Sequence, residues 1–237
     1  MNTKKAALIT GSSKRIGKSI ALELASIDYS IALHYNTAEK ETKEVANKIK
    51  DLGSECKIFQ CDLSKEEETL LLISRVNKQF KGLELLINNA SIYQKSFFLS
   101  PLDIFYNHLN VNLISPYILS KEFVKLGNRG QIINIIDTKI SKNELGHFAY
   151  LLSKKGLADL TKMSARELGP KIRVNAIAPG CILPPKDENP TYINSLINKL
   201  PLKKQGSLKN ISNAVRFLIE NNYITGQIIF VDGGENL

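Results

Sequence analysis

Short apolar runs alternate with longer amphipathic stretches along the whole of this 237-residue chain, and this alternation limits the fold more than any other feature. The runs are continuously apolar, which is typical of strands buried on both faces. Apolar residues at helical spacing in the intervening stretches indicate helices with one face toward a core. Strands alternating with helices predict a parallel sheet that is covered on both sides.

We therefore expect an α/β protein with a single doubly wound Rossmann domain over residues 1–237 and a seven-stranded parallel sheet. The expected strands lie at 6–10, 30–35, 57–60, 83–88, 131–136, 173–178 and 227–231. The expected helices, on both faces, lie at 16–27, 38–52, 65–80, 103–126, 150–168 and 208–219. A proline-rich stretch at 179–201 follows a strand, where such sheets carry ligand loops, so we expect a substrate loop there.

Charge and cysteine content narrow the functional classes. The net charge is +9, but the lysines are scattered over expected helix faces, so we expect no nucleic-acid partner. The three cysteines, Cys56, Cys61 and Cys181, have neither metal-ligand nor disulfide spacing. The chain has no long apolar run, and its N-terminal apolar run is too short for a secretory signal. We expect no membrane segment, no metal and a cytoplasmic location.

The turn after the first expected strand, residues 10–19, reads TGSSKRIGKS. Glycine in such a turn lets backbone N–H groups approach a phosphate at a helix N-terminus. Five residues separate Gly11 from Gly17, one more than in a P-loop. Because Asp137 also ends an apolar run, as a Walker B aspartate does, a P-loop hydrolase remains an alternative to a dinucleotide site. Arg15 opposes the helix dipole in the first turn, which favours an anionic ligand.

Tyr150 and Lys154 are spaced to share one face of an expected helix. A free phenol titrates near ~10, and an ammonium beside it lowers that pKa. The pair can therefore form a proton donor for the reduction of a carbonyl or an imine.

Further motifs occur in a fixed order around this pair. They are Thr10-Gly11 through Gly17, Cys61-Asp62-Leu63, Asn88-Asn89-Ala90, Asn112, Asp137, Tyr150 with Lys154, Pro179-Gly180 and Asp232-Gly233-Gly234. In this order they resemble the short-chain dehydrogenase/reductase family over essentially the whole chain. The resemblance implies a nicotinamide cofactor, Tyr150 as the catalytic acid and Lys154 as its activator.

Three positions depart from the usual family pattern. Asp137 replaces a serine, Ser91 replaces the glycine after Asn-Asn-Ala, and Arg15 replaces the middle glycine of the cofactor loop. Together they are similar to the pteridine reductases, including bacterial dihydromonapterin reductases, as is the segment Asn-Leu-Ile-Ser-Pro-Tyr at 112–117. The resemblance implies an NADPH-dependent reductase of dihydropterins or dihydrofolate.

The resemblance also implies the members of the site. The implied catalytic residues are Asp137, Tyr150, Lys154 and Asn112. The implied substrate contacts are Arg15, Ser91, Tyr93, Asp137 and Tyr150, with Tyr93 stacking on the pterin ring. The implied cofactor contacts are Gly11, Ser13, Lys14, Arg15, Ile16, His34, Tyr35, Asn36, Thr37, Asp62, Leu63, Asn89, Ala90, Ser91, Pro179 and Gly180.

An aspartate at position 137 suits a pterin, because reduction of its C=N bond must also protonate a ring nitrogen. A serine hydroxyl would only donate a hydrogen bond, whereas a carboxyl can be a proton source when burial raises its pKa. Two alternatives stay open: a ketone or 3-oxoacyl thioester reductase of the same family, and a non-catalytic NADP-binding protein.

The preferred cofactor is NADP(H). NAD-specific members carry an acid at the end of the second strand, whereas this chain has no acid before Glu39. Pteridine reductases commonly have Arg-Ser where this chain has Thr37-Ala38, so the candidates for the 2′-phosphate are Lys14, His34, Asn36, Thr37 and Lys40. Family members are usually tetramers that pack helices such as those expected at 103–126 and 150–168, and we expect the same here.

Overall fold

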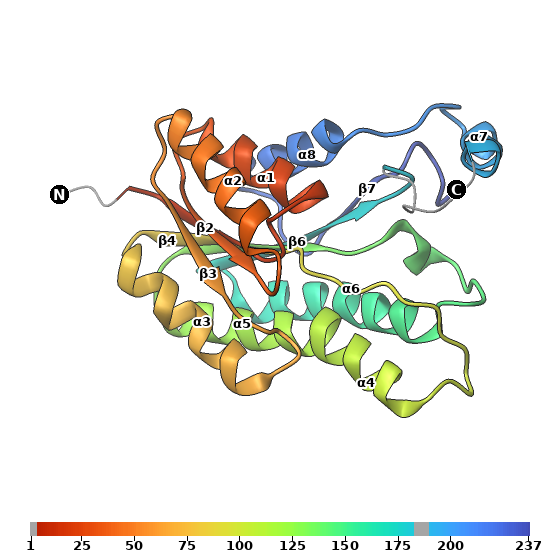
Figure 1. The fold of residues 1–237 in the computed structure, drawn as a ribbon, viewed down its shortest axis with the longest axis horizontal. Helices are drawn as coiled ribbons and strands as arrows, with labels where there is room; N and C mark the ends of the chain where they lie inside the picture. Colours follow the sequence, from red (N-terminus) through yellow and green to blue (C-terminus); the bar gives the residue numbers. More distant parts are fainter. Residues whose placement is uncertain (1–3, 183–189) are drawn as a thin grey trace.

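The computed structural model describes residues 4–182 and 190–237, and of residues 190–194 only the helix that they begin. Within these ranges the chain forms a seven-stranded sheet in the order β3-β2-β1-β4-β5-β6-β7, and every neighbouring pair is parallel. Helices cover both faces of the sheet (Figure 1). The predicted doubly wound Rossmann fold is confirmed.

The strands follow the apolar runs closely. They are β1 (Ala6–Ile9), β2 (Ser30–Tyr35), β3 (Cys56–Gln60), β4 (Leu83–Asn88), β5 (Gly130–Ile135), β6 (Ile172–Pro179) and β7 (Ile228–Val231). The inner strand β1 is wholly buried, whereas the edge strands β3 and β7 are partly exposed. Burial on both faces explains why these strands are continuously apolar.

Two helical layers enclose the sheet. One layer holds α1 (Arg15–Ala25), α2 (Glu39–Asp51) and α8 (Leu208–Glu220), and the other holds α3 (Glu66–Gln79), α5 (Ser115–Lys125) and α6 (Phe148–Leu168) (Figure 1). The first layer packs Ile20, Val45 and Val215 into one apolar cluster. The second packs Leu72 and Phe123 into another on the opposite face. These clusters hold the strand ends, and hence the site, in a fixed frame.

The prediction of one continuous helix over 103–126 is wrong, because the structure interrupts it. The structure has α4 (Leu102–Leu109), a π-helical turn (Asn110–Ile114) and then α5. Pro116 lies in the first turn of α5 and has no N–H to donate to the carbonyl of Asn112, four residues earlier. The wider π turn accommodates this break and turns the Asn112 side chain into the protein.

The predicted substrate loop also contains a helix, α7 (Pro190–Lys199), that the sequence patterns did not predict. Residues 183–189 of that loop lie outside the described residues. A second unpredicted element is the 3-10 turn Thr138–Ser141, directly after Asp137. The strand order reverses between β1 and β4, and the carboxyl ends of parallel strands at such a point form a binding crevice.

Candidate active site

The loop after β1 needs glycine at both of its glycine positions. Gly11 has φ +61°, and a Cβ there would lie 2.9 Å from the Cα of Ala90. A Cβ on Gly17 would lie only 2.4 Å from the backbone oxygen of Gly11. The loop therefore packs directly on the start of α1, whose first turn has no acidic residue. This is a cradle for a phosphate group at a helix N-terminus, so the loop fits a dinucleotide.

Side chains from β2 and from the end of β4, the strands on either side of β1, hold this loop. Asn89 Nδ2 donates to the backbone oxygens of Thr10 (2.8 Å) and Gly11 (3.0 Å). The backbone N–H of Gly11 donates to Nδ1 of His34 (3.0 Å), so the imidazole carries its proton on Nε2 and donates it to the oxygen of Cys61 (3.0 Å). Burial lowers the pKa of His34 to about 4, which keeps the ring neutral.

The placement of His34 corrects one sequence-based prediction. The sequence-based candidates for the cofactor phosphate include this residue. Its side chain is instead buried, and both ring nitrogens bind protein backbone. A neutral, fully engaged imidazole cannot supply a positive charge to a phosphate. His34 therefore supports the loop, as does Asn89, whose amide is engaged by the same loop backbone.

Four other predicted cofactor residues surround the loop at the surface. Lys14 and Arg15 are exposed at the start of α1, and Asn36 and Thr37 are exposed after β2. Arg15 adopts φ +54°, a left-handed conformation that explains why the related family pattern has glycine there. Their common position beside β2 suits a group attached to the ribose of a dinucleotide.

The remaining predicted cofactor residues are placed mainly by packing. Ser13 is buried and shares a hydrogen bond with Thr42 (2.9 Å), while Ile16 and Leu63 pack toward the two cores. Tyr35 and Pro179 end β2 and β6. Gly180 packs closely on the C-terminal turn, since a Cβ there would lie 2.5 Å from the Cβ of Asp232.

Asp62 follows β3 with its carboxylate already engaged. Oδ1 accepts hydrogen bonds from the N–H (3.0 Å) and the hydroxyl (2.7 Å) of Ser64. Burial alone would raise the pKa of Asp62, but the Ser64 hydrogen bonds hold it below the usual value. The group is therefore an ionised acceptor beside the loop.

The catalytic candidates meet at the ends of β5 and α6. The hydroxyl of Tyr150 donates to Oδ2 of Asp137 at 2.6 Å, and Oδ1 of Asp137 accepts the backbone N–H of Lys139 at 2.8 Å. Tyr150 is only 6% exposed and Lys154 only 2%. Lys154 Nζ donates to the backbone oxygen of Ile135 (2.9 Å) and lies 5.9 Å from the centre of the Tyr150 ring.

These contacts reverse one expected pKa shift. We expected Lys154 to lower the pKa of Tyr150, but burial and then the Asp137 carboxylate raise it well above its usual value. Burial also lowers the pKa of Lys154 to about 8, partly offset by Asp137. Lys154 lies too far away to outweigh a hydrogen-bonded carboxylate. The phenol is therefore a protonated group, and the carboxylate is its acceptor.

Asn112 and Ser91 lie beside one another and share a hydrogen bond. Oδ1 of Asn112 accepts from the Ser91 hydroxyl (3.2 Å) and the N–H of Ile92 (2.9 Å). Nδ2 of Asn112 donates to the oxygen of Ile92 and to Ser153 Oγ, both at 3.1 Å. Asn112 thus joins the segment after β4 to the helix α6, which carries Tyr150 and Lys154. Its side chain positions that segment, and the Ser91 hydroxyl points toward Asn112.

Tyr93 and His147 form an aromatic wall beside Tyr150. Their rings stack at 4.2 Å, with the Tyr93 hydroxyl 2.9 Å from His147 Nε2. The Tyr93 ring also meets the Tyr150 ring edge to face at 4.7 Å. Backbone bonds from Ser96 to Gly146 and Phe148 hold the two segments together. His147 had no assigned role from sequence, because its contact with Tyr93 depends on this tertiary pairing.

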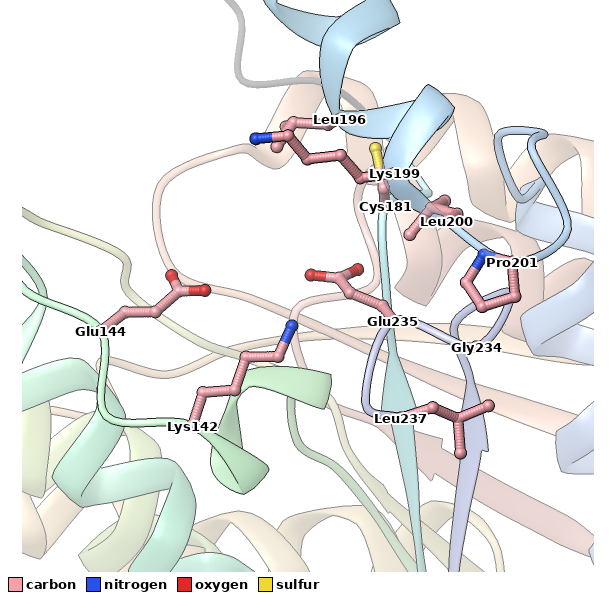
Figure 2. Close-up of a pocket in the computed structure, with 10 residues that line it drawn as sticks. All are labelled: Lys142, Glu144, Cys181, Leu196, Lys199, Leu200, Pro201, Gly234, Glu235 and Leu237. Carbon is pink, nitrogen blue, oxygen red and sulfur yellow. The ribbon is translucent and has the colours of Figure 1, made fainter.

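A cavity of about 410 Å³ lies beside this centre, between the segment after β5, α7 and the C-terminal turn (Figure 2). The residues that line it include Lys142, Glu144, Cys181, Leu196 and Glu235. Figure 2 shows the side chains of Lys142 and Glu235 directed toward one another across this space. Burial raises the pKa of Glu235, and Lys142 opposes that shift. Cys181 and Leu196 belong to the predicted substrate loop at 179–201. No sequence motif indicates Lys142, Glu144 or Glu235, because distant segments bring them to this cavity.

Neither a metal centre nor a membrane helix is found in the part of the chain that the structure describes. No group of three or more His, Cys, Asp or Glu side chains is arranged to hold a metal ion there. No described helix is long and apolar enough to cross a membrane.

Comparison with known proteins decides the family. The family model described as Enoyl-(Acyl carrier protein) reductase matches residues 11–236. The 3-oxoacyl-[acyl-carrier-protein] reductase FabG of Buchnera aphidicola is 35% identical over 241 residues, covering 98% of this chain and 97% of that protein. This chain belongs to the short-chain dehydrogenase/reductase family. The members of this family are NAD(P)-dependent oxidoreductases, so the P-loop hydrolase alternative is wrong.

Solved structures agree with that assignment. FolM alternative dihydrofolate reductase 1 from Brucella canis, complexed with NADP, has a TM-score of 0.91 and 35% identity, covering 98% of this chain and 94% of that one. A short-chain dehydrogenase/reductase variant from Serratia marcescens has a TM-score of 0.92 and 28% identity, covering 98% of each chain. The relatives of this short-chain dehydrogenase/reductase thus include FabG, named as a 3-oxoacyl-[acyl-carrier-protein] reductase, and FolM, named as a dihydrofolate reductase.

Proposed function

We propose that this protein is an NADPH-dependent pterin reductase, acting on a dihydropterin or on dihydrofolate. The observation that carries the proposal is the 2.6 Å hydrogen bond from Tyr150 to Asp137. It joins two acid groups at the place where the usual family pattern supplies a serine hydroxyl. Such a pair suits a substrate that must gain a proton on a ring nitrogen, because a buried phenol and a carboxyl can share one transferable proton.

The residues of the chain would divide the chemistry as follows. NADPH supplies the hydride when bound, and the glycine cradle of Gly11 and Gly17 fits its phosphates. Tyr150 holds a proton at neutral pH because its pKa is raised, and Asp137 orients that hydroxyl. Asp137 is partly exposed, so it can restore the proton from solvent. The Lys154 ammonium stabilises the phenolate that forms when Tyr150 gives up its proton.

The aromatic wall also supports a flat heteroaromatic substrate. Tyr93 is 52% exposed although it stacks on His147, so part of its side chain is open to solvent beside Tyr150. A pterin ring would gain stacking energy on such a surface, whereas an aliphatic acyl chain would gain less.

NADP(H) is the cofactor that the surroundings of β2 favour. No carboxylate follows β2 before Glu39, so nothing there repels a 2′-phosphate. Lys14, Arg15, Asn36 and Thr37 are the exposed candidates for binding it. The FolM proteins of Brucella canis and Brucella suis, both 35% identical, were solved with NADP.

A 3-oxoacyl thioester reductase is the second candidate, and the identity to FabG proteins favours it. Tyr150 and Lys154 would serve that reaction equally well. Asp137 argues against it, because the usual family pattern has at this position a serine, whose hydroxyl hydrogen-bonds the substrate carbonyl. A non-catalytic NADP-binding role would leave the cost of burying Lys154 unexplained. We also propose that the chain is a single domain with a substrate loop at 179–201, and that the protein is a cytoplasmic tetramer.

One assay separates these candidates. NADPH oxidation is measured with dihydrobiopterin or acetoacetyl thioester, for the wild type, Tyr150→Phe and Asp137→Ser. We expect a pterin rate that Tyr150→Phe abolishes and that Asp137→Ser lowers by about 100-fold or more, while NADPH still binds. Unchanged pterin turnover in Asp137→Ser refutes the role of the aspartate. A Tyr150-dependent rate with the thioester alone supports the second candidate, and NADPH binding without turnover supports the third.

A further inference from the structure

The Asp-Gly-Gly motif at 232–234 has no part in the chemistry above, yet its aspartate is one of the most engaged carboxylates of the described chain. Asp232 is 8% exposed and follows β7. Its Oδ2 accepts the hydroxyl of Thr138 at 2.5 Å and the N–H of Asn236 at 3.0 Å. Its Oδ1 accepts the N–H of Gly234 at 3.0 Å. The short bond to Thr138 joins positions 94 residues apart.

Thr138 lies directly beside the catalytic carboxylate. It is 1% exposed and begins the 3-10 turn Thr138–Ser141 that Asp137 caps. Asp137 accepts the N–H of Lys139 with one oxygen and the Tyr150 hydroxyl with the other. The direction of the Asp137 side chain therefore depends on the backbone of this turn. The hydroxyl of Thr138 ties that backbone to Asp232.

Asp232 is itself held on a firm support. The N–H of Gly180 donates to the oxygen of Val231 at 3.1 Å, and the close packing of Gly180 on Asp232 leaves no room for a Cβ. The oxygen of Gly233 accepts the N–H of Leu202 at 3.2 Å. The C-terminal turn, residues 232–237, is thus fixed to the end of β6 and to the segment after α7. A carboxylate anchored in this way can restrain a neighbouring loop without moving itself.

We propose that Asp232 is a positioning residue, which acts through the Thr138 hydroxyl to hold the Asp137 carboxylate within hydrogen-bond distance of Tyr150. A short hydrogen bond from a hydroxyl to a carboxylate oxygen is among the stronger ones in proteins, so the bond from Thr138 to Asp232 is suited to hold the turn. Proton transfer requires heavy atoms about 2.6–3.2 Å apart, and a misplacement of about 1 Å can cost a large factor in rate. The role does not depend on which substrate the protein reduces.

The test uses Thr138→Val, Thr138→Ser, Asp232→Asn and the double variant Thr138→Val/Asp232→Asn. Ser141→Ala is the matched control, because Ser141 donates to the Thr138 oxygen within the same turn and does not contact Asp232. The kcat and KM for dihydrobiopterin, or for acetoacetyl thioester if only that is reduced, are measured together with the NADPH dissociation constant. A second readout needs no substrate: the ¹³Cζ resonance of Tyr150 in tyrosine-labelled protein, assigned by its loss in Tyr150→Phe.

We expect Thr138→Val to lower kcat about tenfold while the NADPH dissociation constant stays within about twofold. The Tyr150 resonance should move in Thr138→Val, whereas Thr138→Ser and Ser141→Ala should resemble the wild type in both readouts. The double variant should be no slower than the slower single variant, since both residues act through one contact.

The proposal is overturned by an unmoved Tyr150 resonance in Thr138→Val, or by equal losses of kcat and NADPH affinity, which would indicate a general structural defect. Additive losses in the double variant would overturn it as well. If the wild type turns over no pterin, the proposed substrate is wrong, and the resonance still decides the role of Asp232.

Discussion

The stability of the Lys154→Met variant relative to the wild type should be higher at neutral pH than at alkaline pH. The ammonium is 2% exposed, and its hydrogen bond in the described structure is to the backbone oxygen of Ile135. Burial disfavours the charged form and lowers the pKa of Lys154 from 10.5 to about 8. Methionine fills a similar volume without a charge, so it removes this penalty.

The size of the effect follows from proton linkage. Below about pH 8 the lysine is protonated in both the folded and the unfolded chain, and the full burial penalty is present. Between about 8 and 10.5 the unfolded chain binds more protons, so the stability of the wild type rises with pH. At about 1.4 kcal/mol for each pKa unit, the whole shift amounts to about 3 kcal/mol.

Equilibrium denaturant unfolding of the wild type and Lys154→Met between pH 7 and 9.5 measures this effect. Taking the difference between the two proteins cancels other titrating groups. The free energy of unfolding of Lys154→Met minus that of the wild type should fall by about 2 kcal/mol over that range, because the wild type gains stability as the pH rises. Lys162→Met, which removes an exposed lysine from the same helix, is the control. A difference that does not change with pH would refute the reasoning.

Three further predictions concern ligands. Gly17→Ala should weaken NADPH binding about tenfold or more, because the added Cβ meets the backbone of Gly11. The control is Gly156→Ala, whose Cβ would lie 2.9 Å from a side-chain atom of Leu113 that can move, so a binding titration should show a smaller loss. His147→Gln should raise the KM for a pterin about two- to tenfold with little change in kcat, and an equal rise for an acyclic ketone would contradict the stacking role. NADPH should bind more tightly than NADH in fluorescence titrations. The reverse order would contradict the proposal that the 2′-phosphate of NADPH binds beside the end of β2.

The sequence could predict the parts of the site that local patterns determine. Continuous apolar strands and amphipathic helices specified the α/β sheet, and the ordered motifs around Gly11 and Tyr150 indicated the family. These features depend on spacing along the chain, which burial and helical periodicity fix directly. The break at Asn112 was missed, although Pro116 marks it, because the apolar periodicity continues across the π turn.

The contacts that tune the chemistry came only from the tertiary structure. His34 is only two residues from the exposed Asn36, yet the pairing of β2 with β1 and β3 buries it beneath the glycine loop. Likewise, Asp137 and Asp232 are acidic residues of similar appearance in the sequence. Asp137 accepts the Tyr150 hydroxyl and Asp232 accepts the Thr138 hydroxyl, because β5, β6 and β7 bring their ends together. The sequence by itself determined which fold and which reactive groups are present; their pKa shifts and partners were decided by burial and by contacts between distant segments, which no local pattern encodes.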